Sequence, residues 1–149
     1  MLDELDRRIS EIDGVLNTLI EKNGYSYNQY AVLYSLGESP EGCCTQKKIS
    51  ENWYIPKQTV YNICQDLLKK GWIVFTKSET DKREKIITLT EAGRPFAHEL
   101  YCNAEAFSSE VLKKFGKQRA QRLYELLSSF KEICAQEVEK LPSKEMVLN

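Results

Sequence analysis

Apolar residues recur with helical spacing at both ends of this chain and form shorter, mixed patterns between them. Leucines and isoleucines three and four positions apart predict an amphipathic helix over residues 2–22. The same spacing predicts longer helices over about residues 91–114 and 118–140. Between them, residues 26–89 contain short helical patterns followed by two short apolar runs. The chain is therefore predicted to be mainly α with a small β-hairpin.

Two short helices are expected before the apolar runs. Ser26 followed by Gln29 has the spacing of a capping box, which predicts the start of the first. Thr45 is a good N-cap for the second, whose Trp53 is expected to face inward. The segment 38–44 is polar, contains proline and glycine, and is predicted to be a loop.

A third helix is predicted to begin near Pro56 and to run to about Lys70, where Gly71 supplies a left-handed stop. Its inner face is apolar: Val60, Ile63, Cys64, Leu67 and Leu68. Its outer face carries amides, a phenol and one cation: Gln58, Tyr61, Asn62, Gln65 and Lys69. Asparagine and glutamine pair with adenine in the major groove, and lysine reaches phosphate or guanine. This face therefore either contacts DNA or is a solvated surface without a partner.

A charged loop separates the two apolar runs, residues 72–75 and 86–89, which are predicted to be strands. This pattern predicts a hairpin with a projecting tip, whose Lys82, Arg83 and Lys85 can reach the sugar-phosphate backbone or a minor groove. Asp81 is expected to fold back and fix an arginine, most simply Arg83. A solvated charged hairpin is the alternative, and the preceding helix favours the DNA-binding interpretation.

In this order and spacing the sequence resembles the MarR family of bacterial transcription regulators. The matching segments are Thr59-Val60, residues 67–73, Asp81-Lys82-Arg83, and residues 89–93. The resemblance implies a single domain over residues 1–149, with a winged helix-turn-helix lobe over 26–89 flanked by N- and C-terminal dimerisation helices over 2–22 and 91–141. It also implies a homodimer that binds a pseudo-palindromic operator, usually as a ligand-responsive repressor.

The regular apolar seam of the N-terminal helix fits this expectation. The seam packs either within its own subunit or against a second copy. Matching stripes on the C-terminal helices favour the subunit interface. A two-fold dimer would place two recognition helices on the same side of DNA.

Candidate DNA-contacting residues lie on the second short helix, along the third helix and on the hairpin. They are Lys47, Lys48, Lys57, Gln58, Thr59, Tyr61, Asn62, Gln65, Lys69, Lys82, Arg83 and Lys85. Residues 45–89 contain nine Lys and Arg against five Asp and Glu, although the whole chain has a net charge of −1. Attraction for DNA is therefore expected to be local, moderate and weakened by salt.

The resemblance also implies a ligand pocket where the dimer helices meet the DNA-binding lobe. Tyr30, Tyr34 and His98 are the candidate ligand-binding residues, and Phe96 and Tyr101 could complete the pocket. Aromatic walls with a few polar tips suit a small phenolic or planar organic effector. The alternative is that these aromatic side chains belong to the core.

Five cysteines, irregularly spaced, do not form a disulfide framework in a chain without an export signal. Cys43 and Cys44 are adjacent, so a redox-responsive regulator is an alternative, as are two ordinary loop thiols. The sequence has one histidine and no Cys-x-x-Cys, so no metal site or cofactor is expected.

Sequence signatures of other classes are weak. There is no glycine-rich phosphate loop, no catalytic pair of acids and no Gly-x-Ser-x-Gly, so no enzymatic activity is expected. A winged-helix protein-docking module without DNA binding would need apolar anchors where the third helix has amides. No apolar stretch approaches the length of a membrane span, and the acidic N-terminus lacks a signal-peptide pattern. A cytoplasmic location is expected.

Overall fold

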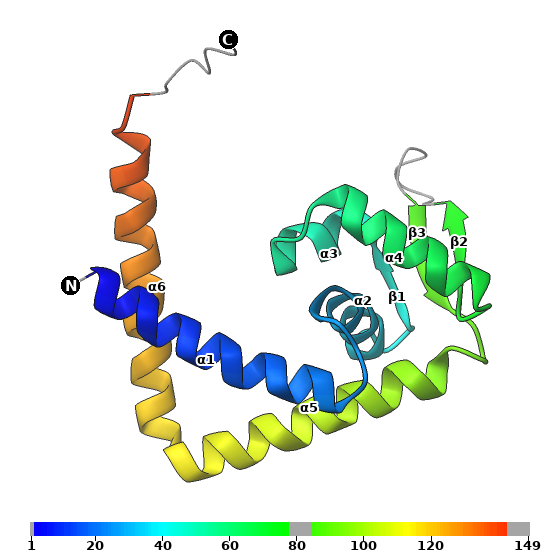
Figure 1. Ribbon diagram of the computed structural model, residues 1–149, viewed down its shortest axis with the longest axis horizontal. Coiled ribbons are helices and arrows are strands. Elements are labelled where there is room, and N and C mark those ends of the chain that lie inside the picture. The colour runs from blue at the N-terminus through cyan, green and yellow to red at the C-terminus, as the bar shows by residue number, and fades with distance from the viewer. Residues whose placement is uncertain (1, 78–84, 143–149) are drawn as a thin grey trace. The chain divides into compact units, whose positions relative to one another are not determined.

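The structure is a computed structural model that describes residues 2–77 and 85–142 (Figure 1). The chain forms two compact units, Met1–Glu105 (the first unit) and Ala106–Asn149 (the second unit). The elements in order are α1 (Leu2–Lys22), α2 (Tyr27–Glu38), β1 (Cys43–Thr45), α3 (Gln46–Trp53), α4 (Lys57–Lys69), β2 (Ile73–Lys77), β3 (Lys85–Leu89), α5 (Arg94–Phe115) and α6 (Lys117–Glu139). The predicted fold class, mainly helical with a small antiparallel wing, is confirmed.

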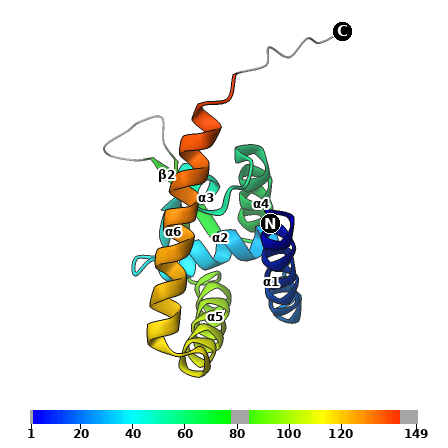
Figure 2. The ribbon, with the colours of Figure 1, turned by 90° about the vertical axis from the view of Figure 1, so that its left-hand side faces the viewer.

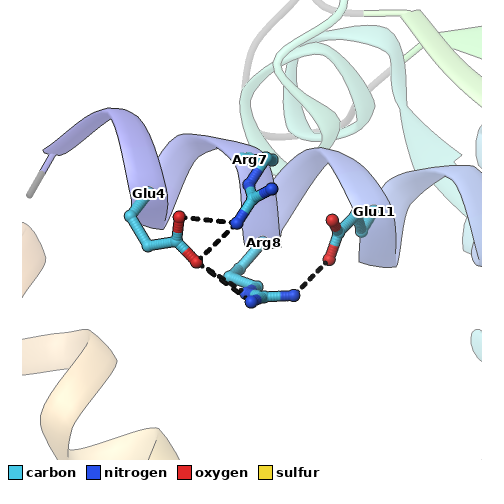
Figure 3. Close-up of polar contacts among 4 residues, drawn as sticks. All are labelled: Glu4, Arg7, Arg8 and Glu11. Carbon is cyan, nitrogen blue, oxygen red and sulfur yellow. Dashed lines mark hydrogen bonds and ion pairs between the residues drawn. The ribbon is translucent and has the colours of Figure 1, made fainter.

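The helix α1 carries a row of paired charges near its start and a row of exposed apolar side chains along its length. Glu4 pairs with Arg7 at 2.7 Å and with Arg8 at 3.0 Å, and Arg8 also reaches Glu11 at 3.0 Å (Figure 3). Exposed pairs of this spacing contribute only about 0.2–0.5 kcal/mol each. The apolar positions of the same helix are left exposed, among them Ile9, Ile12, Val15 and Leu16. Ile20, close to the end of α1, is buried in the core.

The helix α2 lies in the middle of the first unit, with α3 and α4 beside it in both views (Figures 1 and 2). Ala31, Val32, Leu33 and Leu36 have no exposed surface, so the helix is buried on several sides. Its N-terminus is fixed by the predicted capping box: the Gln29 N–H donates to Ser26 Oγ, and the Ser26 N–H donates to Gln29 Oε1.

The sheet has three antiparallel strands in the order β1-β3-β2. Ile87 of β3 lies opposite Cys44 on one side and Phe75 on the other. The prediction of a loop over 38–44 is therefore wrong at both ends, because Glu38 is the last residue of α2, and Cys43 and Cys44 belong to β1. A three-residue strand is too short to show a period-two pattern, and it is specified by its pairing with β3.

Most predicted features of α4 are confirmed. Pro56 is its N-cap, and Gly71 follows its end with a φ of 71°. The predicted inner face is wrong for Leu68, which is 37% exposed. At 100° per residue Leu68 falls about 80° from Val60, at the edge of the apolar stripe.

The connection from β3 to α5 holds the wing to the end of α4. The Thr90 hydroxyl donates to the Gly71 carbonyl at 2.6 Å and accepts from the Gly93 N–H at 3.2 Å. The Thr90 N–H donates to the Trp72 carbonyl at 2.9 Å. Because of these bonds α5 begins at Arg94, three residues after the predicted start at residue 91. Trp72, which was predicted to begin a strand, lies in a turn before β2.

The second unit contains the last turns of α5, then α6. Ala120 is its buried residue, and large apolar side chains are exposed along both helices: Val111, Leu112, Phe115, Leu123, Leu126, Leu127, Phe130 and Ile133. Within the described ranges, no helix has both the length and the apolar character needed to cross a bilayer.

Candidate nucleic-acid interface

The two helices α3 and α4 form a helix-turn-helix with a firmly held turn. Ile49 of α3, together with Val60 and Cys64 of α4, has no exposed surface. Ile55 is buried within the turn, and its carbonyl accepts a hydrogen bond of 2.7 Å from Ser50 Oγ. This packing fixes α4 against the core through one face and leaves the other face free.

The free face of α4 carries the predicted polar residues. Gln58 and Asn62 are exposed, and Tyr61 is 41% exposed. Gln58 Nε2 donates to Asn62 Oδ1 at 3.0 Å, which orders the two amides side by side. Lys69 is exposed and pairs with Asp66 at 3.4 Å. The remaining candidates on this helix are exposed Lys57 and half-buried Thr59 and Gln65.

Lysines are placed at the starts of both helices. Lys47 and Lys48 are exposed in the first turn of α3, where the Lys48 N–H donates to the capping Thr45 hydroxyl at 3.2 Å. Lys57 is the first residue of α4. Helix N-termini are positive ends of the helix dipole, so these positions attract phosphate.

The wing candidates are described in part. Lys85 begins β3, is exposed, and places its Nζ 5.6 Å from the centre of the Phe75 ring. Asp81, Lys82 and Arg83 lie outside the described residues, so their contacts stay predictions.

Three tyrosines of α2 surround Trp53 of α3, and Tyr101 of α5 joins them through Tyr34. This aromatic cluster consists of Tyr27, Tyr30, Tyr34, Trp53 and Tyr101. The Tyr34 ring lies 5.8 Å from Tyr30, 5.6 Å from Trp53 and 5.3 Å from Tyr101, measured between centroids. Trp53 Nε1 donates to Ser35 Oγ at 2.9 Å. The cluster thus joins α2 and α5 to the helix that precedes α4.

Two carboxylates set the electrostatics of the cluster. The Tyr34 hydroxyl donates to Glu105 Oε1 at 3.4 Å. Burial, followed by the negative charges of Glu105 and Glu38, raises the pKa of Tyr34 to about 12. Tyr34 is therefore a neutral hydrogen-bond donor at physiological pH.

The structure brings together two of the three predicted ligand residues. Tyr30 and Tyr34 stack, whereas His98 is exposed with its Nε2 3.5 Å from Cys102 Sγ. Phe96 lies elsewhere, stacked on Trp72 with centroids 4.0 Å apart. The sequence predicts only that Trp53 faces inward and gives it no place in the ligand site. A buried indole N–H needs a hydrogen-bond acceptor, so the indole of Trp53 could have indicated that this residue lies beside polar side chains.

Cys43 and Cys44 line a pocket of about 380 Å³ between α2, β1 and α3. Other lining residues are Ser35, Glu38, Ser39, Pro40, Lys48 and Asn52. Burial raises the pKa of Cys44, and Cys43 Sγ lies 3.6 Å from Glu41 Oε2. Cys64, behind them on α4, is fully buried, and this burial raises its pKa to about 11.

A packed helix-turn-helix with a polar outer helix and an adjoining antiparallel wing defines a winged-helix DNA-binding transcription regulator. The model of the MarR family matches residues 23–84. A MarR family regulator from Neisseria meningitidis has a similar structure, with a TM-score of 0.82 and 37% identity over 93% of this chain and 96% of that chain. The chain therefore belongs to the MarR family.

Two further relatives share less sequence identity with this chain. The HTH-type transcriptional regulator SarZ of Staphylococcus epidermidis is 26% identical over 113 residues, 74% of this chain and 72% of SarZ. CouR of Rhodococcus jostii, solved bound to p-coumaroyl-CoA, shares the fold at 21% identity and a TM-score of 0.66, over 85% of this chain and 87% of CouR. The Neisseria protein and SarZ are transcriptional regulators rather than enzymes.

Proposed function

We propose that this MarR-family protein is a sequence-specific repressor that binds a pseudo-palindromic operator as a homodimer and responds to a small organic effector. The observation that carries the proposal is the outer face of α4. Its Gln58 and Asn62 are exposed, and the hydrogen bond between them orders the two amides side by side.

The polar residues of α4 divide into two roles. Gln58 and Asn62 present amide donors and acceptors of the kind that recognise adenine in the major groove. Lys47, Lys48 and Lys57 lie at helix N-termini, where they would hold phosphates without reading sequence. A helix of this kind enters the groove by its N-terminal residues while the first helix of the pair crosses the backbone.

Exposed apolar side chains support a homodimer. The first unit exposes Ile9, Ile12 and Val15 along α1, and the second exposes a longer series along α5 and α6. Rows of exposed apolar side chains along a helix usually mark an interface. A second copy of the chain offers matching stripes, and two-fold symmetry would pair two α4 helices with two half-sites.

The aromatic cluster is the proposed effector site. Tyr34 and Tyr101 present partly exposed aromatic rings, whereas Tyr30, stacked on Tyr34, is buried in the core. CouR, which shares the fold, was solved bound to p-coumaroyl-CoA, a ligand with an aromatic acyl group. Glu38 and Glu105 would repel a ligand carboxylate placed beside Tyr34. A neutral phenolic or planar ligand therefore fits this edge better. Such a ligand would regulate DNA binding only if it bound more tightly to one of two arrangements of the DNA-binding lobes.

Oxidation of Cys43 and Cys44 is the second candidate for the regulatory input. The observation in its favour is that both thiols line one pocket with Lys48, a candidate phosphate contact. A change at these thiols would reach α3 directly. Peroxide treatment that leaves DNA affinity unchanged would remove this candidate.

Selection from a pool of randomised duplexes tests the proposed function. Purified protein should enrich a two-fold symmetric motif whose half-sites lie about one helical turn apart. A protein-docking module would enrich no motif. A single, unrepeated half-site would contradict the homodimer while leaving sequence recognition in place.

A further inference from the structure

Tyr54 combines an unusual backbone with an unusual exposure. It caps the C-terminus of α3 with φ 52° and ψ 37°, in the left-handed region. Within residues 2–77 and 85–142 it is the one non-glycine residue with positive φ. Its side chain is nevertheless 92% exposed. The left-handed conformation costs a residue with a Cβ about 1–2 kcal/mol, so glycine or asparagine is the usual choice.

Local hydrogen bonds hold the backbone at Tyr54 in place. The Tyr54 N–H donates to the Ser50 carbonyl, as does the Ile55 N–H at 3.2 Å. Ser50 Oγ in turn donates to the Ile55 carbonyl, and Ile55 is anchored in the core. The turn would therefore keep its shape with glycine at position 54. The exposed phenol makes almost no contribution to the packing.

We infer that Tyr54 is a further DNA-contacting residue, which packs its ring on a deoxyribose and donates its hydroxyl to a backbone phosphate beside the groove that α4 enters. This inference rests on the proposed DNA-binding function. Tyrosine hydroxyls are among the common donors to phosphate. A strained residue retained where the fold gains nothing from its side chain points to a function for that side chain.

Position in the chain supports this assignment. Tyr54 lies three residues before Lys57, which is the first residue of α4. The Cα atoms of the two residues are therefore at most about 10 Å apart. The N-terminal residues of a recognition helix reach the base edges, and the preceding helix crosses the backbone. Tyr54 caps the C-terminus of α3, the preceding helix of the pair. This position would place Tyr54 next to the DNA backbone that borders the groove. Lys57 adds positive charge at the same edge.

Two substitutions separate this contact from a structural role. Tyr54→Gly removes the ring and the backbone strain, and Tyr54→Phe removes the hydroxyl alone. Binding is measured for the duplex enriched by selection and for a scrambled duplex, at two salt concentrations, and melting temperature is measured alongside. Lys57→Ala is the matched control, because it removes a charge three residues away.

Tyr54→Gly should weaken binding to both duplexes by roughly tenfold, because a phosphate contact is strong but carries no sequence information. Tyr54→Phe should show a smaller loss. The melting temperature of Tyr54→Gly should not fall. The salt dependence should stay as in the wild type, whereas Lys57→Ala should lower the slope by about 1.

Other outcomes contradict the inference in distinct ways. Affinity of Tyr54→Gly within about twofold of wild type, with wild-type binding intact, would show that Tyr54 does not contact DNA. A marked fall in its melting temperature would assign Tyr54 a structural role. Absence of wild-type binding to either duplex would overturn the proposed function and this contact with it.

Discussion

Gln58 and Asn62 are joined across one turn of α4, with Gln58 Nε2 donating to Asn62 Oδ1 at 3.0 Å. The bond leaves the Gln58 Oε1 acceptor and the Asn62 Nδ2 donors available. Side chains ordered before binding lose less conformational entropy when they meet a partner. The pair is therefore suited to presenting a fixed pattern of donor and acceptor to the edge of a base.

Removal of either amide should reduce sequence preference. Gln58→Ala and Asn62→Ala should each cost about 1–3 kcal/mol of affinity for the operator, with little change for scrambled DNA. The double variant should lose less than the sum, because each single change already frees the other amide. Measuring both affinities for the three variants checks this prediction.

Lys47→Ala is the matched control for the amide variants. It should weaken binding to all duplexes alike and reduce the salt slope by about 1. The division of roles would be wrong if the amide variants behaved in the same way as Lys47→Ala.

A close approach of α2 and α5 should make Gly37 intolerant of a side chain. A Cβ at Gly37 would lie 2.5 Å from the Ala97 carbonyl oxygen and 3.0 Å from Tyr101 Cβ. Gly37→Ala should therefore destabilise the protein by about 1–3 kcal/mol, measured as a lower denaturant midpoint. Gly14→Ala in α1 is the control, since a Cβ added there would meet no atom within 4 Å apart from its own helix backbone and chain neighbours. That change should be neutral or stabilise by about 0.5–1 kcal/mol.

Thiol reactivity should follow burial. The thiolate is the nucleophile, and burial raises the pKa of Cys64 to about 11 and raises that of Cys44. In native protein, Cys102 should react first with a thiol reagent, because it is exposed. Cys44 should react slowly near neutral pH and faster as pH rises, and Cys64 only on unfolding. Peptide mass analysis of protein labelled over time would reveal the order, and early labelling of Cys64 would contradict the packing of α4.

Stability should decline in alkali through Tyr34. Its pKa is 10.0 without perturbation and about 12 in the folded protein. Between these values the unfolded chain loses this proton while the folded chain keeps it, so raising the pH favours unfolding. Denaturant midpoints should fall over this window, and Tyr34→Phe should flatten the decline. Tyr25 and Tyr30, whose pKa values burial also raises, account for a residual slope. An identical profile for wild type and Tyr34→Phe would contradict the burial of this phenol beside Glu105.

Local patterns predicted the parts of the fold that local chemistry determines. Ser26 and Thr45 cap their helices as expected, and Gly71 ends α4. The strand β1 could not be predicted, because Cys43 and Cys44 become a strand only through pairing with distant β3. The delayed start of α5 likewise depends on the bond from Thr90 to the distant Gly71 carbonyl.

The candidate site divides in the same way. The outer face of α4 follows from helical spacing, so Gln58 and Asn62 could be assigned from the sequence. Tyr101 of α5, which was expected to complete the ligand pocket, does meet Tyr34. Trp53 of α3 also meets Tyr34, and no spacing in the sequence indicates that contact. The left-handed backbone of Tyr54 has no sequence signature of its own, since most left-handed helix ends carry glycine.

The most direct test is to titrate the purified protein against the DNA immediately upstream of its own gene and against a scrambled duplex of equal length. Both titrations are made at low and at moderate salt, since phosphate contacts alone weaken steeply with salt. The account predicts tight binding to the upstream duplex that survives moderate salt and far weaker binding to the scrambled one. Absence of binding to either duplex at low salt would contradict it.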